Sequence, residues 1–231
     1  SGVYTILPIG VNSTYQVYCE MKGNTGWTVI QKHNGEASLD FDRDWEAYKH
    51  GFGNLSSEHW LGLKIIHALT NQAGKRFKLW VDLESFDGDI IYAEYSDFWI
   101  GDEASQYKLH LGGYLGNRGD AFRGAGGNQN QEGQGFSTYD RDNDGCSPCF
   151  SGRSIARNHC SRSDAGGWWF NSCGSAYLNG KWHPKGSHIG KYGAIYWKTW
   201  DPIQSLKSTV TLTYKFNSQT VGFLHYQDSQ I

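Results

Sequence analysis

The residues best suited to chemistry form an acidic loop at positions 136–146, which reads FSTYDRDNDGC. Its acidic side chains, Asp140, Asp142 and Asp144, occupy alternate positions. Carboxylates at this spacing in a glycine-bearing loop can surround a hard cation such as Ca²⁺, which takes about six to eight oxygen ligands. A solvated Asp-rich turn has the same composition. The loop therefore predicts a cation site, with the plain turn as the alternative.

A second segment, residues 160–180, could form a recognition surface beside this loop. It carries the adjacent pair Trp168 and Trp169 between two cysteines. Tryptophan is a frequent hot spot of protein interfaces, but it also fills protein cores. Core packing is the favoured interpretation for the pair. The candidates for an exposed aromatic rim are Tyr177, Trp182, Tyr192 and Trp197.

Cysteine usage indicates an oxidising compartment. The five cysteines are Cys19, Cys146, Cys149, Cys160 and Cys173, and the odd number leaves at least one without a partner inside the chain. The CxxC pair at 146 and 149 could be a disulfide, half of a zinc site or a redox pair. A zinc site would need a second ligand pair, and a redox pair usually opens a helix after a strand. A structural disulfide in a secreted protein is therefore favoured.

Composition excludes several classes of function. The chain has 231 residues and a net charge of −2, which gives no electrostatic attraction to nucleic acid or to an anionic membrane. The sequence contains no run of about 18 apolar residues, as a membrane helix requires, and no signal peptide, which suggests a mature domain. Motifs such as GxSxG and HExxH are absent, so we predict no enzymatic activity. Sequons at Asn12 and Asn54 predict N-glycosylation.

Periodicity predicts the elements that position these residues. Alternating apolar and polar residues predict short antiparallel strands over residues 1–32, and helical spacing predicts helices at 41–50 and 57–69. Further strands are expected at 76–85, 89–100 and 107–114. Between 116 and 200 the periodicity disappears, which is uncommon unless a segment carries function. Strict alternation resumes at 209–216, and this late strand is expected to return to the central sheet.

Several motifs follow one another along the chain in a specific order. They are SGVYTI (1–6), VYCEM (17–21), GWTVIQK (26–32), FGN (52–54), WLGL (60–63), GDAF (119–122), FSTYDRDND (136–144), GGWWFNSC (166–173), LNG (178–180) and SLKSTVTLTY (205–214). In this order they resemble the fibrinogen-related domain, the C-terminal globular module of fibrinogen chains, angiopoietins, angiopoietin-like proteins and ficolins. The resemblance covers nearly the whole chain, and only the last dozen residues have no counterpart.

The resemblance implies an α+β fold, the fibrinogen C-terminal globular fold, in a single domain over residues 1–231. A small N-terminal sheet is expected at 1–32, and a loop-rich, calcium-binding region at 116–204. Between them, a central antiparallel sheet flanked by helices is expected from residues 33–115 together with 205–216.

For the cation, the resemblance implies Ca²⁺ with carboxylate ligands from Asp142 and Asp144. Backbone carbonyls near Cys146 and Pro148 would complete the protein ligands, with water filling the remaining positions. Asp140 would lie beside the site as a supporting residue and would not bind the metal.

The resemblance also implies a disulfide between Cys160 and Cys173, and a partner for Cys19 upstream of this chain. Cysteines directly after the acidic loop and a glycine at Gly174 favour the angiopoietin and angiopoietin-like branch. Sugar-binding and fibrin-assembling relatives usually have His in place of this glycine, which argues against acetyl-sugar recognition. Fibrin-type pockets also place an acidic residue near the position of Lys191, where it receives an N-terminal amine. A lysine would repel that amine, which argues against fibrin-type binding. The candidate ligand-binding residues are Asp164, Trp169, Cys173, Gly174, Tyr177, Tyr192 and Trp197.

The expected function is that of a secreted, calcium-stabilised recognition domain that binds a protein, such as a cell-surface receptor, as angiopoietin-like relatives do. The alternative is an innate-immune type lectin that recognises acetylated or acidic glycans. Relatives usually form oligomers through other segments, so we expect an oligomer assembled in that way. The tripeptide Arg118-Gly119-Asp120 matches an integrin-recognition motif, but its Asp fits the structural GDAF pattern.

Overall fold

The computed structural model describes residues 1–23, 25–124, 129–144, 149–151, 154–156, 160–189 and 193–216. Its helices are α1 (Trp45–His50), α2 (Leu63–Thr70) and α3 (Cys160–Asp164). The strands are β1 (Gly2–Ile6), β2 (Tyr15–Lys22), β3 (Thr25–His33), β4 (Phe52–Gly53), β5 (His59–Trp60), β6 (Arg76–Glu84), β7 (Ile90–Tyr95), β8 (Phe98–Ile100), β9 (Leu109–Leu111), β10 (Tyr114–Gly116), β11 (Cys149–Ser151), β12 (Ser154–Ala156), β13 (Ala176–Tyr177), β14 (Tyr196–Trp197) and β15 (Ser208–Phe216).

One antiparallel sheet forms the frame of the molecule. Its order is β1-β2-β3-β15-β6-β7-β10, with the short strands β4 and β5 attached to β3. The late strand β15 lies between β3 and β6, where Thr211 faces Gln31 on one side and Val81 on the other. The predicted return of this strand to the central sheet is therefore confirmed. Through β15, the strands of residues 1–33 continue into the central sheet and do not form a sheet of their own.

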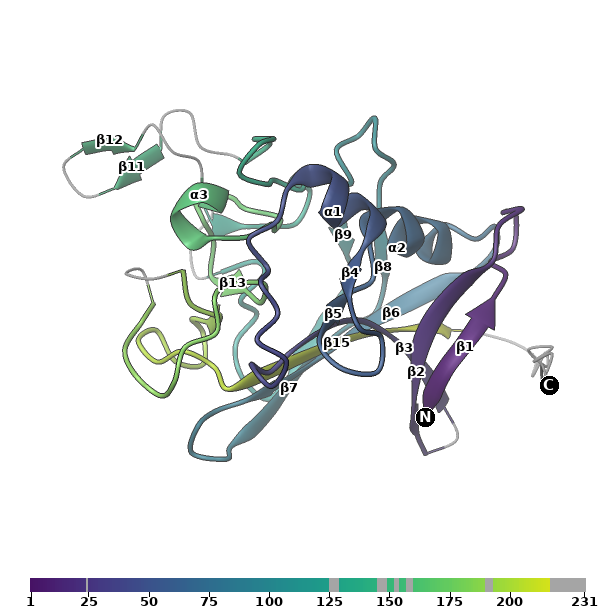
Figure 1. The fold of residues 1–231 in the computed structure, drawn as a ribbon, viewed down its shortest axis with the longest axis horizontal. Coiled ribbons are helices and arrows are strands. Elements are labelled where there is room, and N and C mark those ends of the chain that lie inside the picture. Colours follow the sequence, from purple (N-terminus) through teal and green to yellow (C-terminus); the bar gives the residue numbers. More distant parts are fainter. Residues whose placement is uncertain are drawn as a thin grey trace.

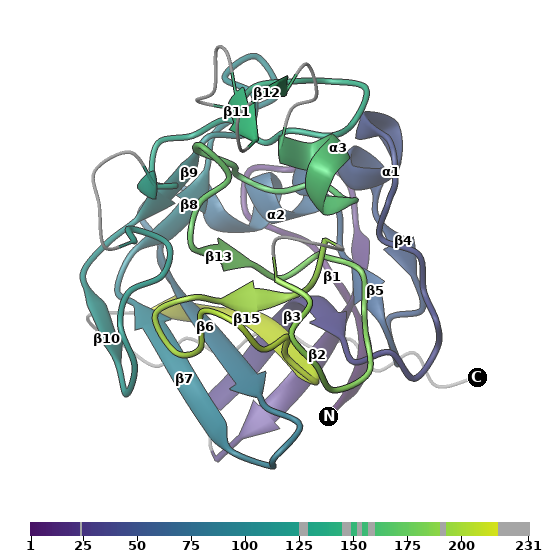
Figure 2. The same ribbon diagram turned by 90° about the vertical axis from the view of Figure 1, so that its left-hand side faces the viewer.

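Helices α1 and α2 cover one face of the sheet, and the loop-rich segment with α3 lies at its side (Figure 1). Figure 2 looks onto that side and shows α1 and α3 at the same end of the molecule. Strand β6 explains why the sheet has an inner face. Phe77, Leu79, Val81 and Leu83 are buried, while the residues between them are half-buried. Alternating side chains point to opposite faces of a strand, so this pattern places one face against the core.

Both predicted helices are shorter than expected. Helix α1 begins after Asp44, whose Oδ1 accepts a hydrogen bond of 2.9 Å from Ala47 N and so caps the helix. The helix expected from residue 57 begins only after Gly62, because this glycine has a φ of 104°, outside the helical range. A Cβ there would lie 2.7 Å from the His50 carbonyl carbon. The preceding pair, His59 and Trp60, forms β5 instead.

Aromatic rings connect the sheet side of the core to the loop-rich side. Phe136 lies 5.7 Å from Trp60 and 5.0 Å from Trp169, measured between ring centroids. Phe122 stacks on Trp168 at 5.8 Å. The loop-rich region is thus organised around buried rings, since regular elements are short there. Within the described residues the longest helix is α2, with eight residues, and none is long and apolar enough to cross a membrane.

Candidate cation and recognition site

The acidic loop starts from a tight turn that is hydrogen-bonded to residues 160–180, the tryptophan segment. Thr138 and Arg141 exchange backbone hydrogen bonds of 2.9 and 3.1 Å. Directly before the turn, Ser137 and Trp168 exchange two more, of 2.9 and 3.1 Å. Asn143 continues the loop, with its side-chain nitrogen donating to the Phe136 carbonyl at 2.7 Å. The loop therefore has a defined path, and it is attached to the segment that sequence analysis selected as a recognition surface.

The Asp140 carboxylate accepts hydrogen bonds from two neighbouring groups. Its Oδ1 accepts hydrogen bonds from the backbone N–H of Trp45, at 3.0 Å, and from the Thr138 hydroxyl, at 2.7 Å. The carboxylate thus connects the loop to the start of α1. Its relation to a metal ion stays a prediction.

Asp142 and Asp144 lie together at the next turn of the loop. The backbone N–H of Asp144 donates to Asp142 Oδ1 at 3.2 Å, and Asp144 Oδ2 accepts from the backbone N–H of Cys160 at 2.9 Å. The two carboxylates offer hard oxygen donors, which suit Ca²⁺. Among the described residues no three His, Cys, Asp or Glu side chains gather closely enough to hold a metal ion. The other predicted ligands, Cys146 and Pro148, lie outside the described residues.

The disulfide between Cys160 and Cys173 is present, with its Cα atoms 5.2 Å apart. It links the start of α3, where the Cys160 N–H donates to Asp144, to the residues that follow the tryptophan pair. Cys19 is a buried free thiol in this structure, and burial raises its pKa. The predicted partnership of Cys146 with Cys149 cannot be assigned to described side chains, since Cys146 lies outside them.

The predicted aromatic rim is wrong for Tyr177 and Trp197, which are buried. Tyr177 and Trp197 are 0% and 1% exposed, and Trp182 is half-buried, while Tyr192 lies outside the described residues. Trp197 turns inward because its Nε1–H donates to the Gly119 carbonyl at 3.0 Å.

Core packing of the tryptophan pair is confirmed. Trp168 and Trp169 are 1% and 3% exposed, and the Trp169 indole N–H donates to the Tyr107 carbonyl at 2.8 Å. The Trp169 ring is therefore not accessible to a ligand at the surface.

Residues 1–216 match the family model of the C-terminal globular domain of fibrinogen beta and gamma chains. The chain belongs to this family. Fibrinogen-like protein 1 from Bos taurus is 40% identical over 223 residues, covering 91% of this chain and 66% of that protein. Angiopoietin-4 from Bos taurus is 38% identical over 211 residues, covering 90% of this chain and 39% of that protein. The fibrinogen-like globe domain of human ANGPTL2 has a TM-score of 0.79 at 38% identity, covering 92% of this chain and 91% of that domain.

These matches confirm the predicted fibrinogen-like α+β fold. Fibrinogen-related domains of this kind are non-enzymatic binding domains, and the chain is therefore not an enzyme. It spans less than two thirds of the length of the two curated relatives, 66% and 39%.

In this fibrinogen-related domain, a side chain at Gly174 would be strained in the conformation that the structure shows. Its φ is 92°, and a Cβ would lie 2.5 Å from the Gln131 side-chain carbon. Gln131 is fully buried and donates to the carbonyls of Trp169 and Ala176, at 2.9 and 3.0 Å. Sequence analysis missed Gln131, because nothing in its local sequence separates it from other loop residues. The glycine is explained by packing against this glutamine.

Asp164 is buried, and the half-buried Lys198 acts on it electrostatically. Asp164 is 7% exposed, and burial raises its pKa to about 6, although the positive charge of Lys198 lowers it. The Lys198 ammonium donates to the Gly174 carbonyl at 3.1 Å and lies 4.4 Å from the Tyr196 ring centroid. This lysine is a further residue at the predicted site that sequence analysis did not select.

The Arg118-Gly119-Asp120 tripeptide is built into the fold. Asp120 forms an ion pair of 2.9 Å with Arg123 and accepts a hydrogen bond of 2.7 Å from the Tyr95 hydroxyl. The Gly119 carbonyl accepts the Trp197 indole N–H. The carboxylate that an integrin would need is thus committed to internal contacts, as the GDAF pattern predicts.

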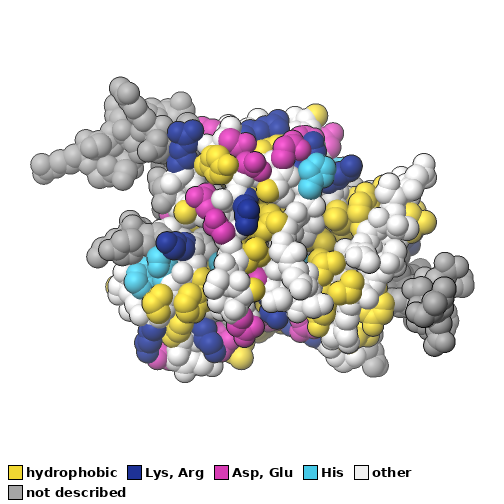
Figure 3. Space-filling view, viewed as in Figure 1, with side chains coloured by type: hydrophobic (Ala, Val, Ile, Leu, Met, Phe, Trp, Pro, Cys, Tyr) yellow, Lys and Arg dark blue, Asp and Glu magenta, His cyan; other side chains and the backbone are white. Residues whose placement is uncertain are grey.

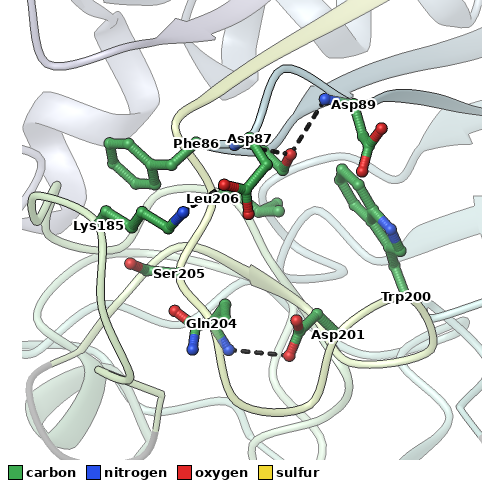
Figure 4. Close-up of a pocket in the computed structure, with 10 residues that line it drawn as sticks. Phe86, Asp87, Asp89, Lys185, Trp200, Asp201, Gln204, Ser205 and Leu206 are labelled. Carbon is green, nitrogen blue, oxygen red and sulfur yellow. Dashed lines mark hydrogen bonds and ion pairs between the residues drawn. The ribbon is translucent and has the colours of Figure 1, made fainter.

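A pocket of about 100 Å³ lies elsewhere, between the β6–β7 turn and residues 200–206 (Figure 4). Asp87 pairs with Lys185 at one wall, and the Trp200 ring forms another. Backbone N–H groups of Ile203 and Gln204 donate to Asp201 Oδ1, at 2.8 and 2.9 Å. None of the predicted site residues lines this pocket.

Proposed function

We propose that this chain is a secreted, calcium-stabilised recognition domain that binds an extracellular protein, such as a cell-surface receptor. Membership of the fibrinogen-related family and the similarity to angiopoietin-4 and to the ANGPTL2 globe support a binding role. The observation that carries the proposal is the position of Asp144. Its carboxylate contacts the first residue of α3, Cys160, which is also one end of the disulfide.

Calcium would be held by Asp142 and Asp144, with the backbone carbonyls of Cys146 and Pro148 as expected further ligands. Bound there, Ca²⁺ would neutralise two neighbouring carboxylates and stabilise the loop. Because the loop is bonded to Cys160 and Trp168, this stabilisation would extend to the disulfide segment. The surface around that segment would therefore keep the shape that a partner recognises.

A thermal melt with added Ca²⁺ and with chelator tests the cation site. Ca²⁺ at about one hundred times its Kd should stabilise the domain by about 2.7 kcal/mol, a Tm increase of about 5–10 °C. Asp142→Asn and Asp144→Asn should each reduce this increase. Asp89→Asn, which alters an exposed aspartate on the β6–β7 turn, is the matched control and should retain it. An unchanged Tm in wild type would contradict a calcium site.

Binding to intact cells tests the partner class. We expect Ca²⁺-dependent binding to a cell-surface protein that persists after enzymatic removal of surface glycans. Calcium-dependent binding to acetylated sugars on a glycan array, without binding to deglycosylated cells, would instead establish the lectin function.

Secretion and N-glycosylation belong to the same proposal. Asn12 and Asn54 are both exposed, and Asn54 Oδ1 accepts the Ser56 N–H at 3.0 Å. Each sequon asparagine is therefore accessible to the glycosylation machinery. A mobility shift after glycosidase treatment of secreted protein, lost in Asn12→Gln or Asn54→Gln, would identify the modified residue. Assembly into an oligomer stays a prediction.

A further inference from the structure

The acidic loop is anchored on two sides before it reaches its carboxylate pair. On the α3 side, the Cys160 N–H donates to Asp144, and the Arg162 guanidinium donates to the Tyr139 carbonyl at 2.9 Å. On the α1 side, Asp140 accepts the Trp45 N–H. The two helices lie at the same end of the molecule (Figure 2). Acidic and basic side chains are interspersed over the α1 region of the surface (Figure 3).

Arg141, between Asp140 and Asp142, makes the second contact on the α1 side. Its guanidinium carbon lies 4.0 Å from the centroid of the Trp45 ring. Trp45 itself is only 4% exposed, so its ring is a fixed surface on which the guanidinium stacks. One guanidinium nitrogen also lies 3.5 Å from Glu103 Oε1.

Glu103 holds this arrangement in place. Its Oε1 accepts the Trp45 indole N–H at 3.0 Å, and its Oε2 pairs with Lys49 at 2.8 Å. The hydrogen bond from Lys49, followed by the one from Trp45, lowers the pKa of Glu103. The carboxylate therefore stays charged at neutral pH and keeps a partner for Arg141.

We propose that Arg141 is a positioning residue of the cation loop, whose contacts with Trp45 and Glu103 hold the following residues so that Asp142 and Asp144 can face one divalent cation. This inference rests on the proposed calcium site. The position of Arg141 is informative because a positive charge next to two metal-binding carboxylates should, by Coulomb repulsion alone, weaken cation binding. Stacking on Trp45 and pairing with Glu103 instead give this charge a structural role.

The test measures Ca²⁺ affinity by calorimetry and Tb³⁺ binding by luminescence, in wild type and in Arg141→Ala. Removing a group that orients metal ligands typically weakens metal binding by about 10-fold or more. We therefore expect about 10-fold weaker Ca²⁺ binding, opposite in sign to the electrostatic expectation. Arg141→Lys keeps the charge and can still contact the Trp45 ring, so it should restore most of the affinity. Equal or tighter binding in Arg141→Ala would overturn the proposal.

The control is Arg76→Ala, which removes one positive charge from the start of β6, where the side chain is 76% exposed. It should leave Ca²⁺ affinity unchanged. If Arg141→Ala does not fold in chelator, Arg141→Gln decides, because it also removes the positive charge: weaker Ca²⁺ binding supports the proposal, and unchanged or tighter binding refutes it. A wild-type protein without Ca²⁺ or Tb³⁺ binding would refute the calcium site itself, whereas wild-type binding with unaltered variants would refute only the role of Arg141.

Discussion

The central sheet and the loop-rich region satisfy their backbone groups in different ways. In the sheet, β6 pairs with β15 at nine consecutive positions, from Glu84 opposite Ser208 to Arg76 opposite Phe216. In the loop-rich region, side chains from distant segments form hydrogen bonds with backbone carbonyls. Gln131 donates to the carbonyl of Trp169, and Gln31 of β3 donates to the carbonyl of Leu178, at 2.8 Å.

This difference explains how a region with few regular elements can be a well-packed part of the fold. Buried backbone groups need hydrogen-bond partners wherever they lie. A strand finds them in its neighbour, but a loop depends on individual side chains at fixed places. Substitution of one such side chain should therefore have a larger local effect in the loop-rich region than at the surface of the sheet.

The largest effect is expected for Trp169→Ala. This substitution removes a buried ring that contacts Phe136 and Trp60, together with the indole N–H bond to Tyr107. We expect a loss of about 3–5 kcal/mol in the free energy of unfolding, measured by urea denaturation. Trp99→Ala, at a position that is 41% exposed, is the control and should cost less than about 1 kcal/mol. Equal losses would show that the loop-rich core is no more demanding than the surface.

The seam between the two regions should be almost as sensitive. Glu58 accepts a hydrogen bond of 2.7 Å from His33, whose other ring nitrogen lies 2.9 Å from the Gly180 carbonyl. Four backbone N–H groups of residues 34–39 also donate to the Glu58 carboxylate. Glu58→Gln should lower the free energy of unfolding by about 3 kcal/mol, because it leaves buried donors around an uncharged group.

Glu58 also predicts acid sensitivity. Burial would raise its pKa, but the hydrogen bonds from His33 and the backbone outweigh burial and lower it to about 2. A carboxylate with a lowered pKa stabilises the fold above its ordinary pKa of 4.5. This contribution should be lost as pH falls from there towards 2. Unfolding curves across this range should show the loss in wild type but not in Glu58→Gln.

Asp164 should respond to pH with the opposite sign. Its pKa of about 6 lies above the ordinary value of 3.8, so the folded state binds an extra proton between these values. Stability should therefore fall as pH rises through this window. Asp164→Asn should stabilise the domain at pH 7 by about 1–3 kcal/mol and have little effect near pH 4. A variant that is no more stable than wild type at pH 7 would contradict this assignment.

The smallest effect is expected on the outer face of the sheet. Lys78 pairs with Glu94 across β6 and β7, with the two side chains 27% and 17% exposed. Ion pairs of this kind contribute about 0–1 kcal/mol. Lys78→Ala should therefore change the urea midpoint only slightly, and a loss comparable to that of Trp169→Ala would remove the contrast between the two regions.

Sequence periodicity predicted the strands well and the helices less well. In β6, the alternation of the sequence matches burial on one face, so this strand could be located directly. The alternation also located β15, although Thr209, Thr211, Leu212 and Thr213 are all buried there, between β3 and β6. The start of α2 depends on Gly62, whose positive φ and close contact with the His50 backbone come from the tertiary fold. The aromatic rim was predicted wrongly for Tyr177 and Trp197 because composition cannot tell an exposed ring from a buried one. The Trp197 side chain reaches the Gly119 carbonyl 78 residues away.

By itself, the sequence determined the strand pattern, the family and the acidic residues that a cation would need, because these depend on local order and residue type. Only the tertiary structure showed that Gln131 occupies the space beside Gly174 and that Arg141 stacks on Trp45. Such contacts join residues far apart in the chain, and their geometry depends on how the whole core packs. The same packing decides which aromatic side chains a partner can reach.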